Sequence, residues 1–389
     1  MIPKDFPDGH FKDGHPFELY GRLRAEGGVV RHPELPLWVV GTHAEVHQAA
    51  TDPAVFRSGD GILIQELDTT YATPPTIMHT DPPGHTRYRA LVAPAFRPTV
   101  LRRLESAVRD RVCTLLAGMP PGAGYDVVAR LSTPLPLQVI CLMLGIPEDD
   151  WPRFAQWSEA IVPGAADLTD QQRDTLRMEA GIYLVEAAHR RRADPRQDVI
   201  SQLATVELDG DRLTDTELVM FLIQLLVAGN ETTRHAISGG MLALAEHPAE
   251  WAALRSHPGL VPSAVEEILR WTSPVVYFLR TATRPVTVGP AEISEGDRLM
   301  LLYGSANRDS LAYGPAADRF DVARPGGPVN LAFGFGPHFC LGAALARMEL
   351  RILLEELVDR YSGLVPAGTT AYNGSTVVTG LRTCELAFR

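Results

Sequence analysis

Cys340 lies in a run rich in glycine and aromatic residues, FGFGPHFCLG, directly before a segment with helical periodicity. A thiol at the start of a helix faces free backbone N–H groups and the positive end of the helix dipole, which favour the thiolate. Gly334, Gly336 and Gly342 remove side chains around the sulfur, as a loop must if a bulky planar ligand is to approach its backbone. A lone cysteine is more often a small buried hydrophobe, but that interpretation leaves the glycines unexplained. The pattern therefore predicts an anionic sulfur beside a large ligand.

A cluster of glycine and polar residues interrupts the most apolar helical segment. The run LLVAGNETTRHAISGG passes from an apolar face to Gly229, Asn230, Glu231, Thr232 and Thr233. Each of these residues lowers helix propensity or costs desolvation in a buried helix. Threonines bonded to carbonyls one turn earlier, and a glutamate paired with an arginine, would account for them singly. For the whole cluster we favour a cavity lined by polar groups.

The helix that carries this cluster has clear end signals. Thr214 begins TDTE, a capping-box sequence, and Pro248 directly follows His247. A helix over 215–247 would be about 50 Å long at 1.5 Å per residue. We therefore expect it to be the central element of the fold.

The rest of the chain divides into helical and strand-like parts. Residues up to about 80 include a hairpin-like alternation, VVRHPELPLWVVG, and 87–270 are mainly helical in periodicity. Strands return after 273, before one last helix near 341–361. No internal repeat or low-complexity linker is visible. We expect a single domain over 1–389, mainly α (α+β), with small peripheral β-sheets.

Composition and charge exclude several classes of function. A net charge of −11 without a long basic run disfavours nucleic acid as a partner. The longest apolar run, FLIQLLVAG, is far shorter than the roughly 20 residues that span a bilayer, so no membrane anchor is expected. The four cysteines form no CxxC pair, which argues against a disulfide framework and a zinc site. The polar, proline-rich start lacks the apolar stretch of a secretory signal, which indicates a cytoplasmic protein.

The run around Cys340 resembles the haem-binding signature of the cytochromes P450, Phe-x-x-Gly-x-x-x-Cys-x-Gly, with Phe333, Gly336 and Gly342 in register. Three further segments resemble family motifs in the expected order. AGNETT is similar to the oxygen-activating stretch, EEILR to the Glu-x-x-Arg pair, and DPPGHTRYRALVAPAF to the haem-facing helix of bacterial members. The chain is therefore identified as a member of the cytochrome P450 family, of the soluble bacterial type.

The resemblance implies haem b between the helix 215–247 and the loop 333–342, with the Cys340 thiolate as the iron ligand. Electron donation from that thiolate favours O–O cleavage in the haem proteins that carry it. The resemblance assigns the haem propionates to His85, Arg89, Arg280 and His338, and further haem contacts to Ala228, Gly229, Phe333, Gly334 and Gly342.

The Glu-x-x-Arg pair is Glu267 and Arg270, three residues apart on one helix face. Alone, such a pair is an intrahelical ion pair worth a few tenths of a kcal/mol. The resemblance implies a structural role instead, in which an arginine of the segment ANRDSLAYGPAADRFDVARP joins the pair and braces the cysteine loop. We expect that arginine to be Arg319.

Thr232 and Glu231 align with the alcohol and the acid that deliver protons in this family. A hydroxyl and a carboxyl side by side suit proton transfer in a mostly dry pocket, and Gly229 would leave room for oxygen. Many relatives have aspartate where Glu231 stands. Because the pair is retained, the resemblance argues against a specialised peroxide-using relative.

These features predict a haem-thiolate monooxygenase that inserts one atom of O2 into an apolar substrate. Neither a GxGxxG after a strand nor a cysteine cluster is present, so electrons are expected from a ferredoxin and an NAD(P)H-dependent ferredoxin reductase. Docking is expected near Arg102, Arg103 and Arg347, on a monomer. The alternatives are a non-catalytic haem-binding sensor or carrier, which the acid and alcohol pair disfavours, and a cysteine hydrolase, for which no partner pattern exists.

The substrate pocket is expected to be apolar, and a steroid, terpenoid, fatty-chain or polyketide-type substrate fits this expectation. Its predicted walls are the segment 60–80, the region around 160–180, and the residues near 275–279. Scattered hydroxyls are expected from Thr69, Thr70 and Tyr71. The individual substrate contacts predicted are Leu225, Ala228, Val275 and Val276.

Overall fold

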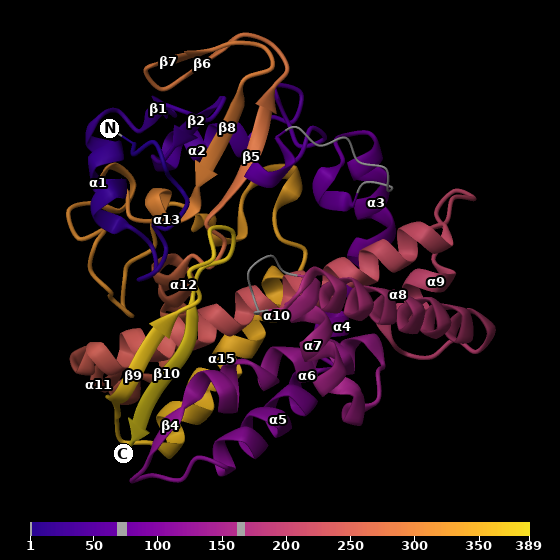
Figure 1. Cartoon of the computed structure of the whole chain (residues 1–389). Helices are drawn as coiled ribbons and strands as arrows, with labels where there is room; N and C mark the ends of the chain where they lie inside the picture. The colour runs from indigo at the N-terminus through magenta and orange to yellow at the C-terminus, as the bar shows by residue number, and fades with distance from the viewer. Residues whose placement is uncertain (1, 68–75, 162–167) are drawn as a thin grey trace.

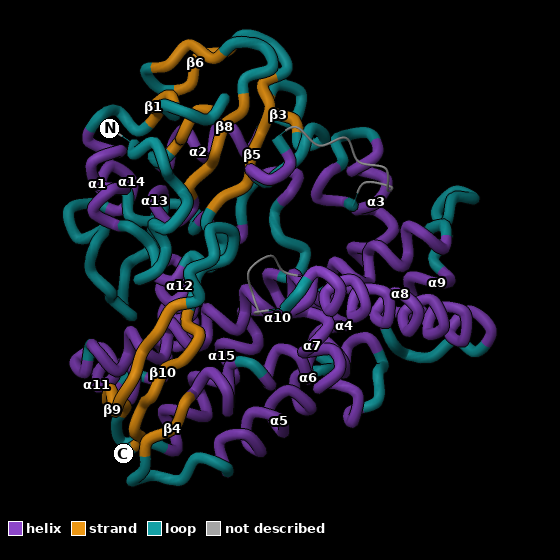
Figure 2. Tube along the Cα trace, viewed as in Figure 1, coloured by secondary structure: helices purple, strands orange, loops and turns teal. Residues whose placement is uncertain are grey.

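The computed structural model describes residues 2–67, 76–161 and 168–389. In Figures 1 and 2 the long helices lie together in the lower part of the view, most of the strands lie above them, and the strands at the C-terminus lie beside the helices. The helices are α1 (Phe17–Ala25), α2 (His43–Thr51), α3 (Gly84–Val92), α4 (Pro98–Leu101), α5 (Glu105–Ala117), α6 (Pro134–Leu144), α7 (Trp151–Ile161), α8 (Asp170–Ala193), α9 (Val199–Thr205), α10 (Asp215–Glu246), α11 (Pro248–Ser256), α12 (Val261–Thr272), α13 (Tyr303–Ala306), α14 (Ser310–Tyr313) and α15 (Ala343–Arg360). The predicted mainly-α fold with small sheets is confirmed.

The strands form separate small sheets within the described residues. They are β1 (Val29–Arg31), β2 (Leu37–Val40), β3 (Phe56–Arg57), β4 (Gly124–Asp126), β5 (Tyr277–Ala282), β6 (Val286–Val288), β7 (Ala291–Ile293), β8 (Arg298–Leu302), β9 (Leu364–Tyr372) and β10 (Leu381–Phe388). The largest sheet has the order β1-β2-β8-β5-β3, in which β2 and β8 are parallel and the other pairs antiparallel. A second sheet has the order β4-β10-β9. The β9–β10 hairpin was not predicted from the sequence.

The central helix is α10, with 32 residues. Its N-terminus has the predicted capping box: Oγ1 of Thr214 accepts a hydrogen bond from the N–H of Glu217 at 3.2 Å. The Glu217 carboxylate in turn accepts one from the N–H of Thr214 at 2.7 Å. These reciprocal bonds satisfy two N–H groups that a helix leaves free. The helix ends at Glu246, before His247 and Pro248.

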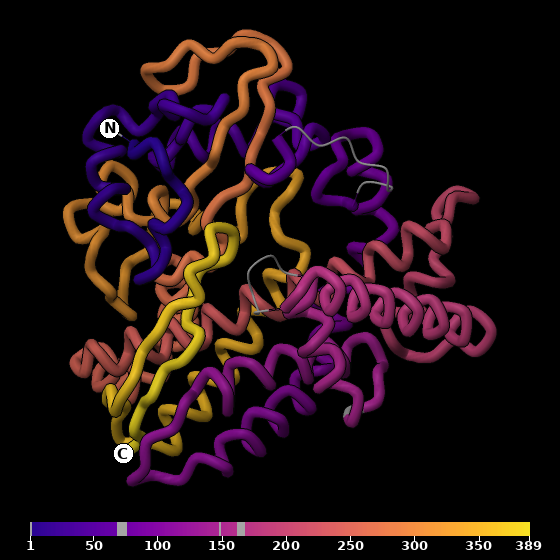
Figure 3. The backbone as a smooth tube through the Cα atoms, viewed as in Figure 1, coloured from indigo at the N-terminus to yellow at the C-terminus, as the bar shows by residue number. Residues whose placement is uncertain are grey.

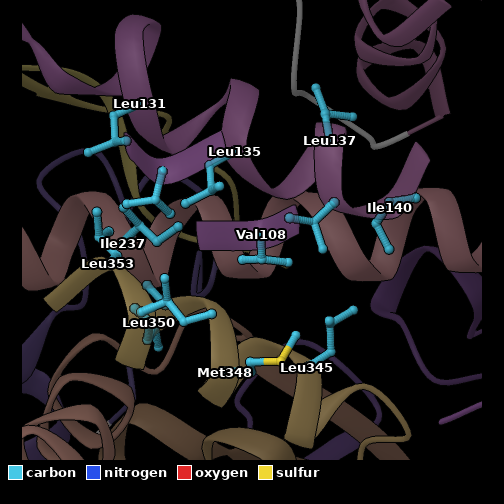
Figure 4. Packing of buried hydrophobic residues seen from close by; sticks show 14 of the residues in the cluster. Val108, Leu131, Leu135, Leu137, Ile140, Ile237, Leu345, Met348, Leu350 and Leu353 are labelled. Atoms are coloured by element: carbon cyan, nitrogen blue, oxygen red, sulfur yellow. The ribbon is translucent and has the colours of Figure 1, made fainter. Parts of the chain in front are cut away.

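The main hydrophobic core surrounds α10. Figure 4 shows α10 running between α6 and α15, with Ile237 of α10 among apolar side chains of both neighbours. The residues labelled there are buried: Val108, Leu131, Leu135, Leu137, Ile140, Ile237, Leu345, Met348, Leu350 and Leu353. This packing fixes α15, and hence the loop that precedes it, against the central helix.

The C-terminal strands contribute to this core, whereas the N-terminal segment packs in a separate cluster with β5 and β8. The trace in Figure 3 runs from the strand-rich side at the N-terminus to the β9–β10 hairpin at the C-terminus. The tip of that hairpin joins the segment before β5: the N–H of Val276 donates to the carbonyl of Val377, and the N–H of Thr379 to that of Pro274, both at 2.9 Å. No helix in the described ranges has the length and apolar character needed to cross a bilayer.

Candidate active site

Cys340 lies two residues before Gly342, the N-cap of α15. Its own N–H donates to the carbonyl of Phe333 at 3.0 Å, which closes the glycine-rich loop. The residue is exposed, although the protein around it excludes most bulk water. This burial raises the pKa of the thiol, while the N–H of Gly342 and the charges of Arg89 and Arg347 act to lower it. The position thus offers donors and positive charge to a sulfur anion.

The loop glycines differ in what they make room for. Gly334 and Gly336 both have positive φ, +66° and +68°. A β-carbon on Gly336 would lie 2.3 Å from the carbonyl oxygen of Ala50, at the end of α2. One on Gly342 would instead lie 4.0 Å from Sγ of Cys340. The interpretation that Gly336 clears the sulfur is therefore wrong, because Gly336 admits the backbone of α2.

Two histidines and two arginines converge beside this loop. The rings of His85, on α3, and His338 have centroids 4.3 Å apart. Burial, together with the charges of Arg280, His85 and Arg89, lowers the pKa of His338 to about 2. Burial and the charge of Arg89 lower the pKa of His85, and Arg280 acts in the same direction. All four predicted propionate residues therefore lie within reach of one another's charge.

In the described part of the chain, the two arginines of this group bond to backbone carbonyls. Within residues 2–67, 76–161 and 168–389, the structure contains no ion pair of Arg89 or Arg280. Arg89 donates to the carbonyl of Phe339 and Arg280 to that of Leu279, each at 2.8 Å. Arg280 is buried, and a buried guanidinium without a carboxylate is costly. The arrangement fits a ligand that brings its own carboxylates.

One side of α10 is open in the middle of the helix. Ala228 is exposed in the middle of a helix whose flanking residues are mostly buried, and Thr232, one turn on, is half-buried. Oγ1 of Thr232 donates to the carbonyl of Ala228 at 2.8 Å. An exposed thiol, an open helix face and a group of unpaired cations together fit a planar, dicarboxylic cofactor such as haem.

Glu231 is turned away from that open side. It is buried, with Oε2 3.0 Å from Nη2 of Arg234 and 3.5 Å from Nε2 of His235. Burial acts to raise the pKa of Glu231, but the nearby His235 and the charge of Arg234 outweigh it and keep this pKa low. Glu231 and Thr232 are thus adjacent in sequence but differ in environment.

Gly229 serves helix packing. A β-carbon there would lie 2.6 Å from Cδ1 of Ile140, on α6. The prediction that Gly229 leaves room for oxygen is therefore wrong, because the room is occupied by Ile140.

The Glu-x-x-Arg pair is a buried ion pair of α12. Nε and Nη2 of Arg270 donate to the two carboxylate oxygens of Glu267, at 2.7 and 2.8 Å. The third member is Arg324, whose Nε donates to Glu267 at 2.9 Å. The prediction of Arg319 is wrong: its side chain is exposed, and only its backbone carbonyl accepts from Arg270, at 2.9 Å. Arg324 stands in the same quoted segment, five residues on.

Some of the predicted pocket residues are accessible and others are buried in the core. Val275 is partly exposed, whereas Val276 is fully buried in the core behind β5. The prediction of Val276 as a substrate contact is wrong, because successive side chains of an extended segment point to opposite faces. Leu225 is almost fully buried in the main core. Thr69, Thr70 and Tyr71 lie outside the described residues.

The predicted docking arginines also differ. Arg102 and Arg103 are exposed. Arg347 instead forms a two-point ion pair with Glu266, at 2.5 and 3.0 Å, and lies 4.7 Å from the ring centre of Phe333. Arg347 is thus engaged by Glu266, which leaves Arg102 and Arg103 as the accessible pair.

Comparison with known proteins identifies the class. The cytochrome P450 family model matches residues 123–258 and 250–374. "Putative cytochrome P450 126" from Mycobacterium tuberculosis is 38% identical over 399 residues, which cover 96% of this chain and 94% of the relative. "Methyl-branched lipid omega-hydroxylase" from Mycobacterium bovis is 37% identical, with 98% and 92% covered. CYP109E1 from Bacillus megaterium, solved in complex with corticosterone, aligns with a TM-score of 0.86 at 33% identity, covering 96% of this chain and 98% of that chain.

The chain belongs to the cytochrome P450 family. It is a monooxygenase, an oxidoreductase whose cofactor is haem b, as the sequence predicted. A substrate, O2 and a redox partner are required in this family. The alternative of a non-catalytic haem sensor or carrier gains no support from a relative named as a hydroxylase.

Proposed function

We propose that this monooxygenase hydroxylates or epoxidises an apolar small molecule. The observation that carries the proposal is the exposed Cys340 at the start of α15, next to four converging cationic or basic side chains. When haem is bound, it supplies the oxidising power that inserts one atom of O2 into a substrate.

The chain's own residues would hold this group at two places. Cys340 would bind the iron through its sulfur, supported by the N–H of Gly342. Arg89 and Arg280 would pair with the two propionates, which would neutralise guanidinium groups that otherwise lack a carboxylate. His85 and His338 would add hydrogen bonds there, and Phe333, Gly334 and Gly342 would form the surface beneath the ring.

Two residues of α10 would manage protons. The Thr232 hydroxyl lies on the open side of the helix. Its oxygen can accept a hydrogen bond from another group while the hydroxyl donates to the carbonyl of Ala228. Glu231 would supply protons to it. Because Glu231 is bound to Arg234 inside the core, delivery requires the carboxyl to loosen that contact.

The substrate is proposed to be apolar, in the range of steroids, terpenoids, fatty chains and polyketides. Ala228, Leu225 and Val275 would contact it. The named lipid hydroxylase and the corticosterone complex support this range.

The remaining properties proposed are a single domain over 1–389, a monomer in the cytoplasm, and electrons from a ferredoxin and an NAD(P)H-dependent ferredoxin reductase. The positive charges of Arg102 and Arg103 would attract an acidic ferredoxin over a distance and raise its rate of association. Added salt should lower this rate.

A two-part experiment tests this function. Corticosterone and a methyl-branched fatty acid are titrated into the purified haem protein, and we expect an apolar ligand to expel water from the iron and shift the haem to high spin. NADPH, ferredoxin reductase and ferredoxin are then added under 18O2, and the product should gain one labelled atom. Leaving out ferredoxin is the control. A protein whose haem shifts with neither ligand, or that gives no oxygenated product with any ferredoxin, would contradict the proposal.

A further inference from the structure

A buried polar cluster lies on the core-facing side of α10. Glu231, Arg234 and His235 are 2%, 8% and 1% exposed. Three of their polar atoms are buried without a hydrogen-bond partner: Oε1 of Glu231, Nε of Arg234 and Nδ1 of His235. Such atoms are rare in proteins and each needs an explanation. The proton delivery proposed above uses Glu231 and its contact with Arg234, but it gives no role to His235.

His235 also contacts the C-terminal hairpin. Nδ2 of Asn373, directly after β9, lies 3.2 Å from Nε2 of His235. A β-carbon on Gly380, at the start of β10, would lie 2.2 Å from Cγ of His235. The ring is therefore clamped between α10 and the hairpin and cannot turn freely.

The orientation of the Asn373 amide is fixed by the hairpin. Its Oδ1 accepts from the N–H of Ser375 at 3.2 Å and from that of Gly380 at 3.4 Å. Its Nδ2 donates to the carbonyl of Val378 at 2.9 Å. The second hydrogen of Nδ2 then faces His235, so Asn373 requires an unprotonated Nε2 with the ring proton on Nδ1.

Glu231 makes the opposite demand on the same nitrogen. Its Oε2 lies 3.5 Å from Nε2 of His235, and a carboxylate there requires an N–H. The charged groups that act on this pair are Arg234, on α10, and Glu159, on α7. One ring nitrogen thus links the acid of α10 to the hairpin, and it can satisfy only one of them at a time.

The tip of the hairpin is in turn bonded to the proposed pocket wall. Val275 pairs with Val378 in an isolated bridge, and the flanking backbone bonds of Val276 and Thr379 hold the two segments together. Both Val275 and Val378 are partly exposed. A ligand that presses on Val275 would therefore act on the segment that carries Asn373.

We propose that His235 is a positioning residue: it sets the Glu231 carboxyl according to the tip of the β9–β10 hairpin, which is tied to the pocket wall at Val275. When Asn373 donates to Nε2, Glu231 is held by Arg234 alone. When the tip withdraws, the ring proton can move to Nε2 and bond Glu231 as well, which holds the carboxyl more firmly and slows proton delivery to Thr232. This inference rests on the proposed role of Glu231 in proton delivery.

The test uses Asn373→Asp in the holoenzyme. The new carboxylate keeps the acceptors for Ser375 and Gly380 but removes the donors that face His235 and the carbonyl of Val378. Ring 15N signals of the ferrous carbon-monoxide form report which nitrogen carries the proton. We expect an unprotonated Nε2 in the wild type and a protonated one in Asn373→Asp. In turnover with NADPH, ferredoxin and reductase, the ratio of peroxide to product should rise about fivefold in the variant, the lower end of coupling between linked sites.

Controls separate this inference from a structural effect and from the role of Glu231. Thr376→Ala, in the same tip, has no bond to His235 and should leave the ring proton and the ratio unchanged. Should Asn373→Asp yield no haem protein, Asn373→Ser removes the same donor. If Glu231→Gln raises the ratio of peroxide to product but the Asn373 variant matches the wild type in both measurements, the inference about His235 is overturned. The proton-delivery role of Glu231 then still stands. Glu231→Gln without any effect would overturn the proton-delivery role, and the inference with it.

Discussion

Replacing Arg324 by alanine should destabilise the protein, and the same change at Arg319 should not. Nε and Nη2 of Arg324 donate to Glu267 at 2.9 and 3.3 Å, and Nη2 also donates to the carbonyl of Ala316 at 3.0 Å. The Arg324 side chain is 13% exposed and that of Glu267 only 1%. The Arg319 side chain is exposed, and its carbonyl survives substitution.

The size of the destabilisation depends on which partners Glu267 keeps after Arg324 is replaced. Breaking a buried ion pair costs about 3–5 kcal/mol when a charge is left alone. Glu267 retains Arg270 and the N–H of Asp321, so we expect the lower value of about 2–3 kcal/mol for Arg324→Ala. An exposed substitution such as Arg319→Ala typically changes stability by no more than about 0.5 kcal/mol.

Urea unfolding of the haem protein, followed by circular dichroism, measures the difference. With a slope of about 3 kcal/mol per molar urea, the midpoint of Arg324→Ala should fall by roughly 0.8 M. A fall for Arg319→Ala equal to or larger than that for Arg324→Ala would refute the assignment of the third member of the cluster.

Three further predictions concern the loop, the last helix and proton delivery. Gly336→Ala should lower the free energy of unfolding by at least about 3 kcal/mol, because strain at positive φ adds to a clash with the backbone of α2. Gly334→Ala should lower it only by the strain, about 1–2 kcal/mol. Equal urea midpoints for the two variants would contradict this. Burial raises the pKa of Glu349 from 4.5 to about 8, so the folded state keeps a proton that the unfolded chain loses, and stability should fall as pH rises between these values. Glu349→Gln should remove this fall, and parallel pH profiles for the two proteins would count against it. Thr232→Ala should keep its haem but release more peroxide per NADPH than Thr233→Ala, and loss of haem would indicate a structural role.

The elements that position the site could be predicted because their signals are local. Capping and proline signals fixed both ends of α10, and the glycine-rich loop before a good helix former fixed the place of Cys340. The β9–β10 hairpin was missed although its sequence, LVPAGTTAYNGSTVVTGLRTCELAFR, contains strand-like alternation around an Asn-Gly pair.

The site predictions that failed depend on the direction in which a side chain points rather than on its position in the sequence. Adjacent residues of a helix point about 100° apart, so Thr232 faces open space while Glu231 faces the core. Val276 lies on the wrong face of its extended segment for the same kind of reason. The choice between Arg319 and Arg324 could not be made from spacing, because both lie in an irregular segment without periodicity. His235 carries no signal of its own in the sequence, since its partner Asn373 is 138 residues away.

The most direct test of the central claim is the absorption spectrum of the purified, reduced protein under carbon monoxide. The thiolate of Cys340 as iron ligand predicts the Soret band of a thiolate-ligated haem for the wild type and its loss in Cys340→Ala. A wild-type band typical of histidine ligation, or an unchanged band in Cys340→Ala, would contradict the account.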